Sequence, residues 1–285
     1  MKVFKIALSL VLIPASFEST LPSHPESRES LERNKRENGY KSALIILHGL
    51  ASGDGLECDE MQKGLSLSTS VKVVCPTADR EPELCLLNIG LVSQLTGRNP
   101  RSWYNMCHMP GQGGEYKSEI DDAVRVVESE VDKLFWNDGI PSEKIVLAGF
   151  SQGGSVALYT ALHTKYKFGG FIGVITWLPL LPVEHPTWFN PVKNADTPVL
   201  HINGEFDLIV QQRVGLDTES ELSKVIPDYT FLLVDGSHST THLNSCTWPK
   251  IANWLSEKGL LELYFVPSLP TCRLNVFQQF FEWWW

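Results

Sequence analysis

Short apolar runs alternate along the chain with longer segments whose apolar residues recur every three or four positions. The runs are typical of buried strands and occupy residues 42–47, 71–74, 144–148, 171–175, 198–202 and 229–234. Residues 117–136 show the clearest helical period, with acidic residues on the opposite face. The apolar positions of that helix are Ile120, Ala123, Val124, Val127, Val131, Leu134 and Phe135. This alternation predicts an α/β protein, with a mostly parallel sheet and helices on both faces.

The third of these runs leads into the sequence GFSQGG at residues 149–154, followed by a run that favours a helix. A strand that ends in G-x-S-x-G and turns directly into a helix exposes its serine at the end of the sheet. Ser151 is therefore the candidate nucleophile. The backbone N–H of Gln152 would face the oxyanion that forms when such a serine attacks a carbonyl. The alternative is a glycine-rich turn with an incidental serine.

A serine nucleophile needs a base, and the base needs a group that orients it. In hydrolases with this turn, the acid and then the histidine follow the serine along the chain. Asp207 comes shortly after the run 198–202, and His238 comes shortly after the run 229–234. Both would lie at the carboxyl edge of the sheet, where catalytic groups collect. Glu205 and Asp235 are the rival acids, and His242 is the rival base.

The first run is followed by a glycine-containing loop, HGLASGDG at residues 48–55. Glycines allow such a loop to bring a backbone N–H close to the serine. Leu50 is the expected second oxyanion donor. An ordinary turn is the alternative reading of this loop.

Further short motifs occur along residues 41–258 in this order: LHGL at 47–50, CP at 75–76, SWY at 102–104, GIP at 139–141, GFSQGG at 149–154, LYTAL at 158–162, WLPL at 177–180, GEFD at 204–207 and HS at 238–239. On these motifs the chain resembles the acyl-protein thioesterase and lysophospholipase family of α/β-hydrolases. The resemblance implies an α/β-hydrolase fold, with Ser151 as nucleophile, His238 as base and Asp207 as orienter. It also implies cleavage of acyl thioesters or esters without a cofactor, with Trp103, Trp177, Leu178 and Leu180 near the acyl groove.

Three features depart from the family pattern. Asn203 stands where the family usually has histidine, and the spacing from Gly236 to His238 is one residue short. Residues 79–101 form an expanded segment beside the expected acyl groove. The resemblance favours a palmitoyl-protein thioesterase, with a lysophospholipase or general carboxylesterase as the alternative. A lipid-binding protein that keeps the fold without activity is the third hypothesis, and the intact set of Ser151, Asp207 and His238 argues against it.

Composition limits the partners. The chain has 285 residues and a formal net charge of -9, which argues against nucleic acid as a ligand. The expected partners are S-acylated proteins, or lysophospholipid and ester substrates, with peripheral membrane contact. His238, His242 and Cys246 are spaced four apart, but no fourth zinc ligand can be named, so no metal is expected.

The two ends of the chain differ from the central domain. Residues 1–20 resemble a signal peptide, with two lysines before an apolar run, and residues 21–41 form a charged connector. The hydrolase domain is expected to span residues 42–258, followed by an atypical apolar tail at 259–285. The signal-like segment predicts a secretory route, against the cytoplasmic location of most of the family. In an oxidising compartment the six cysteines could pair, but spacing does not select a pairing.

Overall fold

The computed structural model describes residues 39–52, 55–80, 101–181, 193–238 and 247–268. Predictions for the signal-like segment, most of the connector, residues 81–100 and the end of the tail lie outside this part of the chain. The strands are β1 (Ser42–Leu47), β2 (Val71–Val74), β3 (Ile145–Phe150), β4 (Gly170–Val174), β5 (Val199–Gly204) and β6 (Tyr229–Val234). The helices are α2 (Leu56–Leu65), α4 (Lys117–Asp138), the short 3-10 helix η1 (Ser142–Lys144), α5 (Gln152–His163), α6 (Gln212–Leu222) and α7 (Thr247–Glu257).

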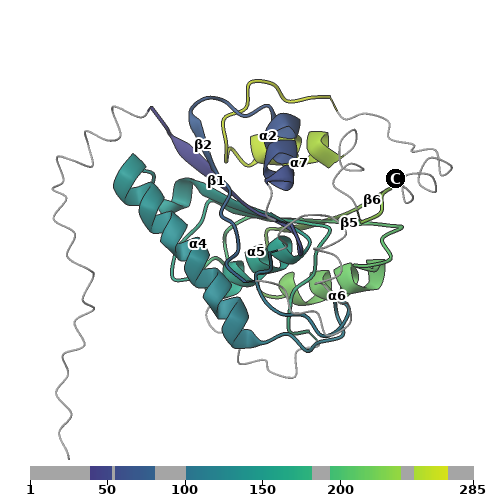
Figure 1. Cartoon of the computed structure of the whole chain (residues 1–285). Helices are drawn as coiled ribbons and strands as arrows, with labels where there is room; N and C mark the ends of the chain where they lie inside the picture. Colours follow the sequence, from purple (N-terminus) through teal and green to yellow (C-terminus); the bar gives the residue numbers. More distant parts are fainter. Residues whose placement is uncertain (1–38, 53–54, 81–100, 182–192, 239–246, 269–285) are drawn as a thin grey trace, which may run out of the picture.

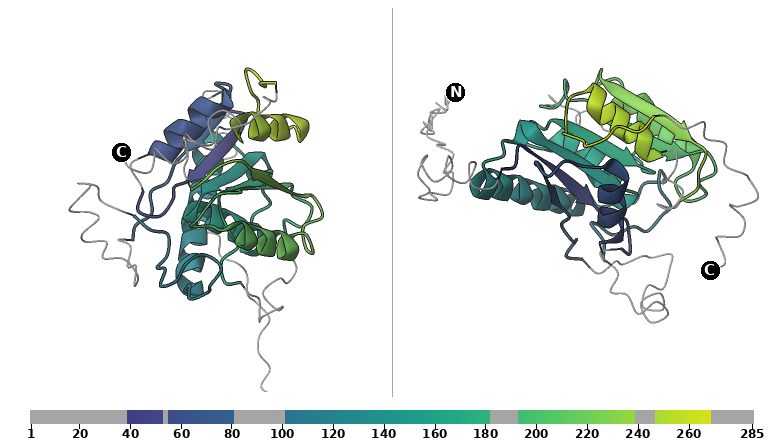
Figure 2. Two further views of the ribbon diagram at one scale, coloured as in Figure 1. Left: turned by 90° about the vertical axis from the view of Figure 1, so that its right-hand side faces the viewer. Right: turned by 90° about the horizontal axis from the view of Figure 1, so that it is seen from above.

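The six strands form one parallel sheet in the order β2-β1-β3-β4-β5-β6. Helices α4, α5 and α6 cover one face, and α2 packs beside α7 on the other (Figures 1 and 2). Every residue of β1, β3 and β5 is buried, as expected for strands covered on both faces. The predicted α/β architecture is confirmed, and its six strand runs match the observed strands to within two residues at either end.

The strand order places one particular pair of loops together. From β1 the chain moves outward to β2, and then returns to the other side of β1 to form β3. The loops that follow β1 and β3 therefore leave adjacent strands in opposite directions. Such a reversal opens a crevice at the carboxyl ends of the strands, where ligands of open α/β sheets bind.

The long helix α4 buries the stripe that the sequence predicts, with one exception. Ile120, Val127 and Leu134 are almost completely buried, whereas Phe135 is 37% exposed. Because successive helical residues are about 100° apart, Phe135 lies beside the buried stripe rather than within it. It packs edge-on against the neighbouring ring of Trp136. Including Phe135 in the core-facing stripe was wrong.

The domain extends past residue 258, where the sequence placed its end. Leu261 is buried in the core, and Leu263 forms an antiparallel bridge with Leu67. The Tyr264 hydroxyl accepts a hydrogen bond from Thr69 N–H. This short segment pairs with the loop between α2 and β2, and such long-range pairing gives no periodic signal in the sequence. No helix within the described residues is long and apolar enough to cross a membrane.

Candidate active site

Ser151 lies at the turn between β3 and α5, in a strained backbone conformation. Its φ and ψ are 51° and −117°, an arrangement that a residue other than glycine adopts only at an energetic cost. The glycines on either side are required by close packing. A Cβ on Gly149 would lie 2.3 Å from the Gly153 carbonyl carbon, and one on Gly153 would lie 2.3 Å from Leu47 O. The elbow predicted from G-x-S-x-G is therefore present.

Three side chains form one hydrogen-bonded series at the carboxyl edge of the sheet. Ser151 Oγ lies 3.0 Å from His238 Nε2, and His238 Nδ1 lies 2.8 Å from Asp207 Oδ2. The other Asp207 oxygen accepts hydrogen bonds from the N–H groups of Ile209 and Val210, at 2.7 and 2.8 Å. The Asp207 side chain is fully buried and that of His238 is 15% exposed. This arrangement fixes the carboxylate and aims the imidazole at the hydroxyl.

The rival acids do not occupy this position. Glu205 is exposed and Asp235 is half-buried, whereas Asp207 contacts His238 directly. The rival base, His242, lies outside the described residues. The short spacing between Gly236 and His238 does not prevent His238 from reaching Ser151. A backbone hydrogen bond joins the loop after β5, which carries Asp207, to the loop after β6, which carries His238. Phe206 N–H, beside Asp207, donates to Gly236 O at 3.0 Å.

Gln152 begins helix α5, so its N–H is among those that have no acceptor within the helix. Its side chain is fully buried and serves another purpose. Gln152 Oε1 accepts from Trp103 N–H at 3.0 Å, and Gln152 Nε2 donates to Tyr104 O at 2.7 Å. The side chain therefore fixes the segment at residues 102–104, while the backbone N–H stays at the start of the helix beside Ser151.

Residues 48–52, here called the β1 loop, contain Leu50 and begin against the elbow, because a Cβ on Gly153 would lie 2.5 Å from His48 O. His48 Nε2 accepts from Ala78 N–H at 3.0 Å, and Trp103 Nε1 donates to His48 O at 2.9 Å. At the other end of the loop, Ser52 forms an antiparallel bridge with Arg101. The loop that the sequence selected is thus held at both ends beside Ser151.

A buried polar network supports Ser151 from beneath. Thr176 Oγ1 donates to Ser151 O at 2.7 Å, and Thr176 N–H donates to Asn203 Oδ1 at 2.8 Å. His201 Nε2 lies 3.0 Å from Thr176 O and 3.1 Å from Asn203 Oδ1. Both of these oxygens are acceptors, so Nε2 carries the proton. The network therefore reaches from β5 to the nucleophile candidate.

The same contacts define the protonation state of His201. Its Nδ1 accepts from the Tyr229 hydroxyl at 2.5 Å. Burial lowers the pKa of His201 to about 4, although its hydrogen bonds to Thr176 and Asn203 act in the opposite direction. Burial also raises the pKa of Tyr229, which keeps its hydroxyl protonated as a donor. His201 is thus a neutral support at neutral pH.

Comparisons with known proteins identify the family of the chain. A model of the phospholipase/carboxylesterase family matches residues 32–244. The chain belongs to this family. Acyl-protein thioesterase 1 of Yarrowia lipolytica is 30% identical over 230 residues, which cover 76% of this chain and 92% of that protein. Acyl-protein thioesterase 1 homolog 2 of Dictyostelium discoideum is 29% identical over 204 residues, covering 70% of this chain and 86% of that protein.

Solved structures show the same fold. SOBER1 of Arabidopsis thaliana aligns with a TM-score of 0.61 at 22% identity, covering 76% of this chain and 99% of that one. Acyl-protein thioesterase 2 of Zea mays aligns with a TM-score of 0.58 at 21% identity, covering 77% and 94% of the two chains. The chain is a serine hydrolase with the α/β-hydrolase fold, and the family predicted from its motifs is confirmed.

The residues expected near the acyl groove of this hydrolase belong largely to its core. Trp103, Trp177 and Leu178 are at most 3% exposed, and Leu180 is half-buried. Trp177 Nε1 donates to Glu115 Oε1 at 3.2 Å. Leu178 also lines a cavity of about 410 Å³ beside α6. Most of the expanded segment expected to form the other wall lies outside the described residues.

Metal binding receives no support from the described part of this hydrolase. Within it, no three His, Cys, Asp or Glu side chains are grouped closely enough to hold an ion. Of the residues weighed as zinc ligands, His242 and Cys246 lie outside this part, and His238 instead contacts Ser151 and Asp207.

Sequence reasoning missed Thr176 in the turn after β4, His201 in β5 and Tyr229 in β6. It noted Asn203 only as a departure from the family. The apolar strand pattern places His201 inside the sheet, and a histidine at a buried strand position was the available signal. Sequence reasoning also missed Glu57 and the Cys58–Cys75 disulfide, which lie on the other side of the crevice.

Proposed function

We propose that this hydrolase cleaves acyl thioesters and esters through an acyl-enzyme formed on Ser151. The series from Ser151 through His238 to Asp207, on a strained elbow, is the observation that carries the proposal. His238 Nε2 takes the proton as Ser151 Oγ attacks the acyl carbonyl, and it returns the proton to the leaving thiol or alcohol. Asp207 holds the imidazole in the required orientation. Water then hydrolyses the acyl-enzyme by the same route.

The oxyanion of each tetrahedral intermediate would be stabilised by the backbone N–H groups of Leu50 and Gln152. These residues belong to the two loops that the strand order brings together. Donors that are fixed before the reaction cost no reorganisation when the charge develops. The same geometry argues against a protein that has kept the fold without activity.

A fatty-acylated protein is the substrate we favour, because the similar proteins of Yarrowia and Dictyostelium are named acyl-protein thioesterases. Apolar side chains at the rim of the site support a lipid-like substrate. Phe206, Leu208 and Ile209 flank Asp207 and are 48%, 72% and 38% exposed. We infer that they contact the acyl chain, or the lipid surface that carries it. A lysophospholipase or general carboxylesterase would use the same rim.

The disulfides give an indication of the cellular compartment in which the protein works. Cys58 is bonded to Cys75, and Cys107 is also disulfide-bonded. Disulfides persist mainly in oxidising compartments. They favour the secretory route over the cytoplasmic alternative.

Labelling with a fluorophosphonate tests the nucleophile. The wild-type protein should be labelled, and folded Ser151→Ala should not, because an alanine cannot form the covalent adduct. His238→Ala should lower kcat roughly 10³-fold or more, whereas His242→Ala should have a small effect. Retained labelling of folded Ser151→Ala would overturn the mechanism, and a reversed order of the two histidine variants would overturn the choice of base.

A series of thioester and p-nitrophenyl ester substrates tests the substrate class. Each buried methylene contributes about 0.8 kcal/mol, which corresponds to roughly fourfold in kcat/KM until the groove is full. We expect kcat/KM to rise with acyl length and to be higher for thioesters than for matched oxyesters. A profile that is flat or falls with chain length would favour a short-chain carboxylesterase and remove the depalmitoylation hypothesis.

A further inference from the structure

A buried carboxylate spans the β1 loop. Glu57 Oε1 accepts from Gly49 N–H at 3.3 Å, and Glu57 Oε2 accepts from Ser52 Oγ at 2.7 Å. The two contacts lie on either side of Leu50 along the chain. Glu57 is only 7% exposed. A buried acid is costly unless its oxygens are hydrogen-bonded, so these bonds hold the loop and the acid together.

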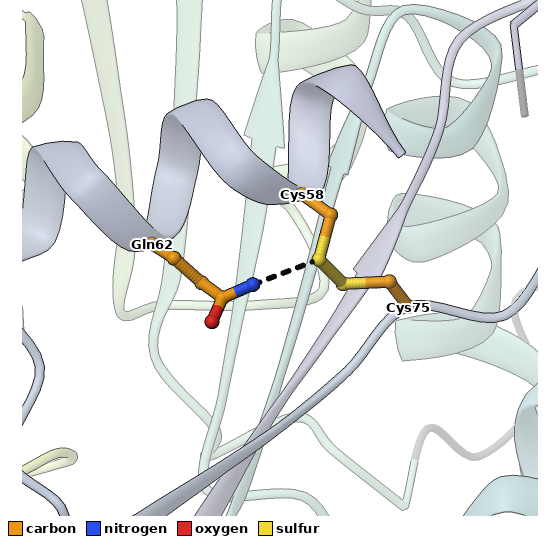
Figure 3. The surroundings of a disulfide bond; sticks show 3 residues. All are labelled: Cys58, Gln62 and Cys75. Carbon is orange, nitrogen blue, oxygen red and sulfur yellow. Dashed lines mark hydrogen bonds between the residues drawn. A yellow bond between two sulfur atoms is a disulfide. The ribbon is translucent and has the colours of Figure 1, made fainter. Parts of the chain in front are cut away.

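Glu57 is itself firmly placed. It lies in the first turn of α2, where the partial positive charge of a helix N-terminus stabilises an acid. The next residue, Cys58, is bonded to Cys75, which directly follows β2 (Figure 3). Gln62 Nε2 also donates to Cys58 Sγ at 3.1 Å. The disulfide therefore fixes the start of α2 relative to the edge of the sheet.

The far side of the disulfide reaches the same loop. Three residues after Cys75, Ala78 N–H donates to His48 Nε2 at 3.0 Å. The β1 loop is thus held by Glu57 on one side and by the segment after Cys75 on the other. The disulfide joins these two supports covalently.

We propose that Glu57 is a positioning residue that sets the Leu50 N–H for the oxyanion, with the Cys58–Cys75 disulfide holding Glu57 in place. The inference rests on the acyl-enzyme mechanism proposed above. Glu57 acts through the Gly49 backbone and the Ser52 side chain and does not touch the reacting atoms. Its loss should weaken transition-state binding and leave ground-state substrate binding nearly unchanged.

Glu57→Gln is the matched test, because it keeps the size of the side chain. The amide keeps one acceptor for Gly49 N–H, but its NH2 group takes the place of the oxygen that accepts from Ser52 Oγ, so the Ser52 hydroxyl must turn round to accept and both contacts lose the stronger carboxylate acceptor. Loss of one oxyanion donor costs roughly 10²- to 10³-fold in kcat, and a displaced donor should cost part of this. We expect kcat on p-nitrophenyl butyrate to fall roughly 10- to 100-fold, with KM within about twofold of wild type. Asp59→Asn, on an exposed position of the same helix, should change neither constant.

The inhibition constant (Ki) of a trifluoromethyl ketone is a measurement that a purely structural role of Glu57 would leave unchanged. The ketone forms a tetrahedral adduct with the serine and places an oxyanion at the site of the donors, so its Ki should rise in parallel with the loss of kcat/KM. Ser52→Ala removes one of the two contacts and should show the same parallel with a smaller loss, roughly 3- to 10-fold. This second variant decides the question if Glu57→Gln does not fold.

The outcomes are distinct. A change in KM alone, an unchanged kcat, or a fall in kcat without a matching rise in Ki overturns the positioning role. If Ser151→Ala remains labelled by fluorophosphonate, the proposed function itself fails. If Ser151→Ala is unlabelled while Glu57→Gln is fully active, the mechanism stands and this inference alone fails.

Discussion

On the Ser151 side of the crevice the supports are neutral groups buried within the sheet, whereas on the β1-loop side they are a carboxylate and a disulfide. Thr176 and His201 come from the turn after β4 and from β5, and both are completely buried. Glu57 and Cys58 come from α2, on one face of the sheet. Both sets hold a backbone segment that faces the same reaction centre.

The two sides should therefore fail under different conditions. The network beneath Ser151 depends on the neutral form of His201, so low pH should destabilise it by favouring protonation of His201. The β1 loop depends on a carboxylate that accepts two hydrogen bonds and on a disulfide, so replacing the carboxylate or adding a reductant should loosen it. Changes on the Ser151 side should mainly lower the unfolding free energy, and changes on the β1-loop side should also lower kcat. Three experiments test this comparison.

The largest expected effect is the loss of stability in acid on the His201 side. The pKa of His201 is lowered from 6.5 to about 4 in the folded protein. Above pH 6.5 His201 is neutral in both states and adds no pH dependence. Between pH 6.5 and 4 the unfolded state binds a proton that the folded state does not, so stability falls as the pH falls, by roughly 3 to 4 kcal/mol in all.

Urea unfolding at a series of pH values measures this loss. His201→Asn cannot titrate, so the difference in unfolding free energy between wild type and this variant should shrink as the pH falls from 6.5 to 4. His108→Asn, at an exposed histidine, is the control. If the wild-type and His201→Asn curves stay parallel, His201 is not held neutral in the folded protein.

The next effect concerns the disulfide. Cys58 and Cys75 are 17 residues apart, and cross-linking a loop of about this length stabilises a protein by about 3 kcal/mol. The double variant Cys58→Ser/Cys75→Ser should lose about that much unfolding free energy, measured by urea unfolding. Its kcat at neutral pH should also fall, because Glu57 loses its anchor. A full kcat in a destabilised double variant would show that α2 holds Glu57 without the disulfide.

The sequence predicted the parts of the site that local chemistry defines. The elbow at residues 149–154 is specified by glycines that close packing requires, and Asp207 and His238 follow predicted strands. The β1 loop and the family could be predicted for the same reason. These features depend on residues that are close in the sequence, or on the rule that strand ends meet at one edge of the sheet.

The supports could not be predicted in the same way. Thr176, His201 and Tyr229 come from separate segments of the chain, and only the register of β4, β5 and β6 brings them together. Glu57 looks like an ordinary acid in the first turn of a helix until the fold places the β1 loop against it. The six cysteines permit many pairings. Each of these features depends on distances that spacing along the chain does not contain.

The smallest expected effect is that of Thr176→Val, which removes one hydrogen bond beneath Ser151. Valine keeps the shape of threonine and leaves the Thr176 backbone contacts to Asn203 and His201 in place. Ser151 O would still accept from Ser155 N–H at 3.0 Å, so the cost should be about 1 kcal/mol of unfolding free energy. For the same reason kcat should fall less than in Glu57→Gln, and Thr176→Ser, which retains the hydroxyl, should be close to wild type. Steady-state kinetics of the three variants at neutral pH provide the comparison. If Thr176→Val loses as much kcat as Glu57→Gln, the position of Ser151 depends on a single hydrogen bond. The contrast between several hydrogen bonds that share the support of Ser151 and one carboxylate that supports the β1 loop would then be wrong.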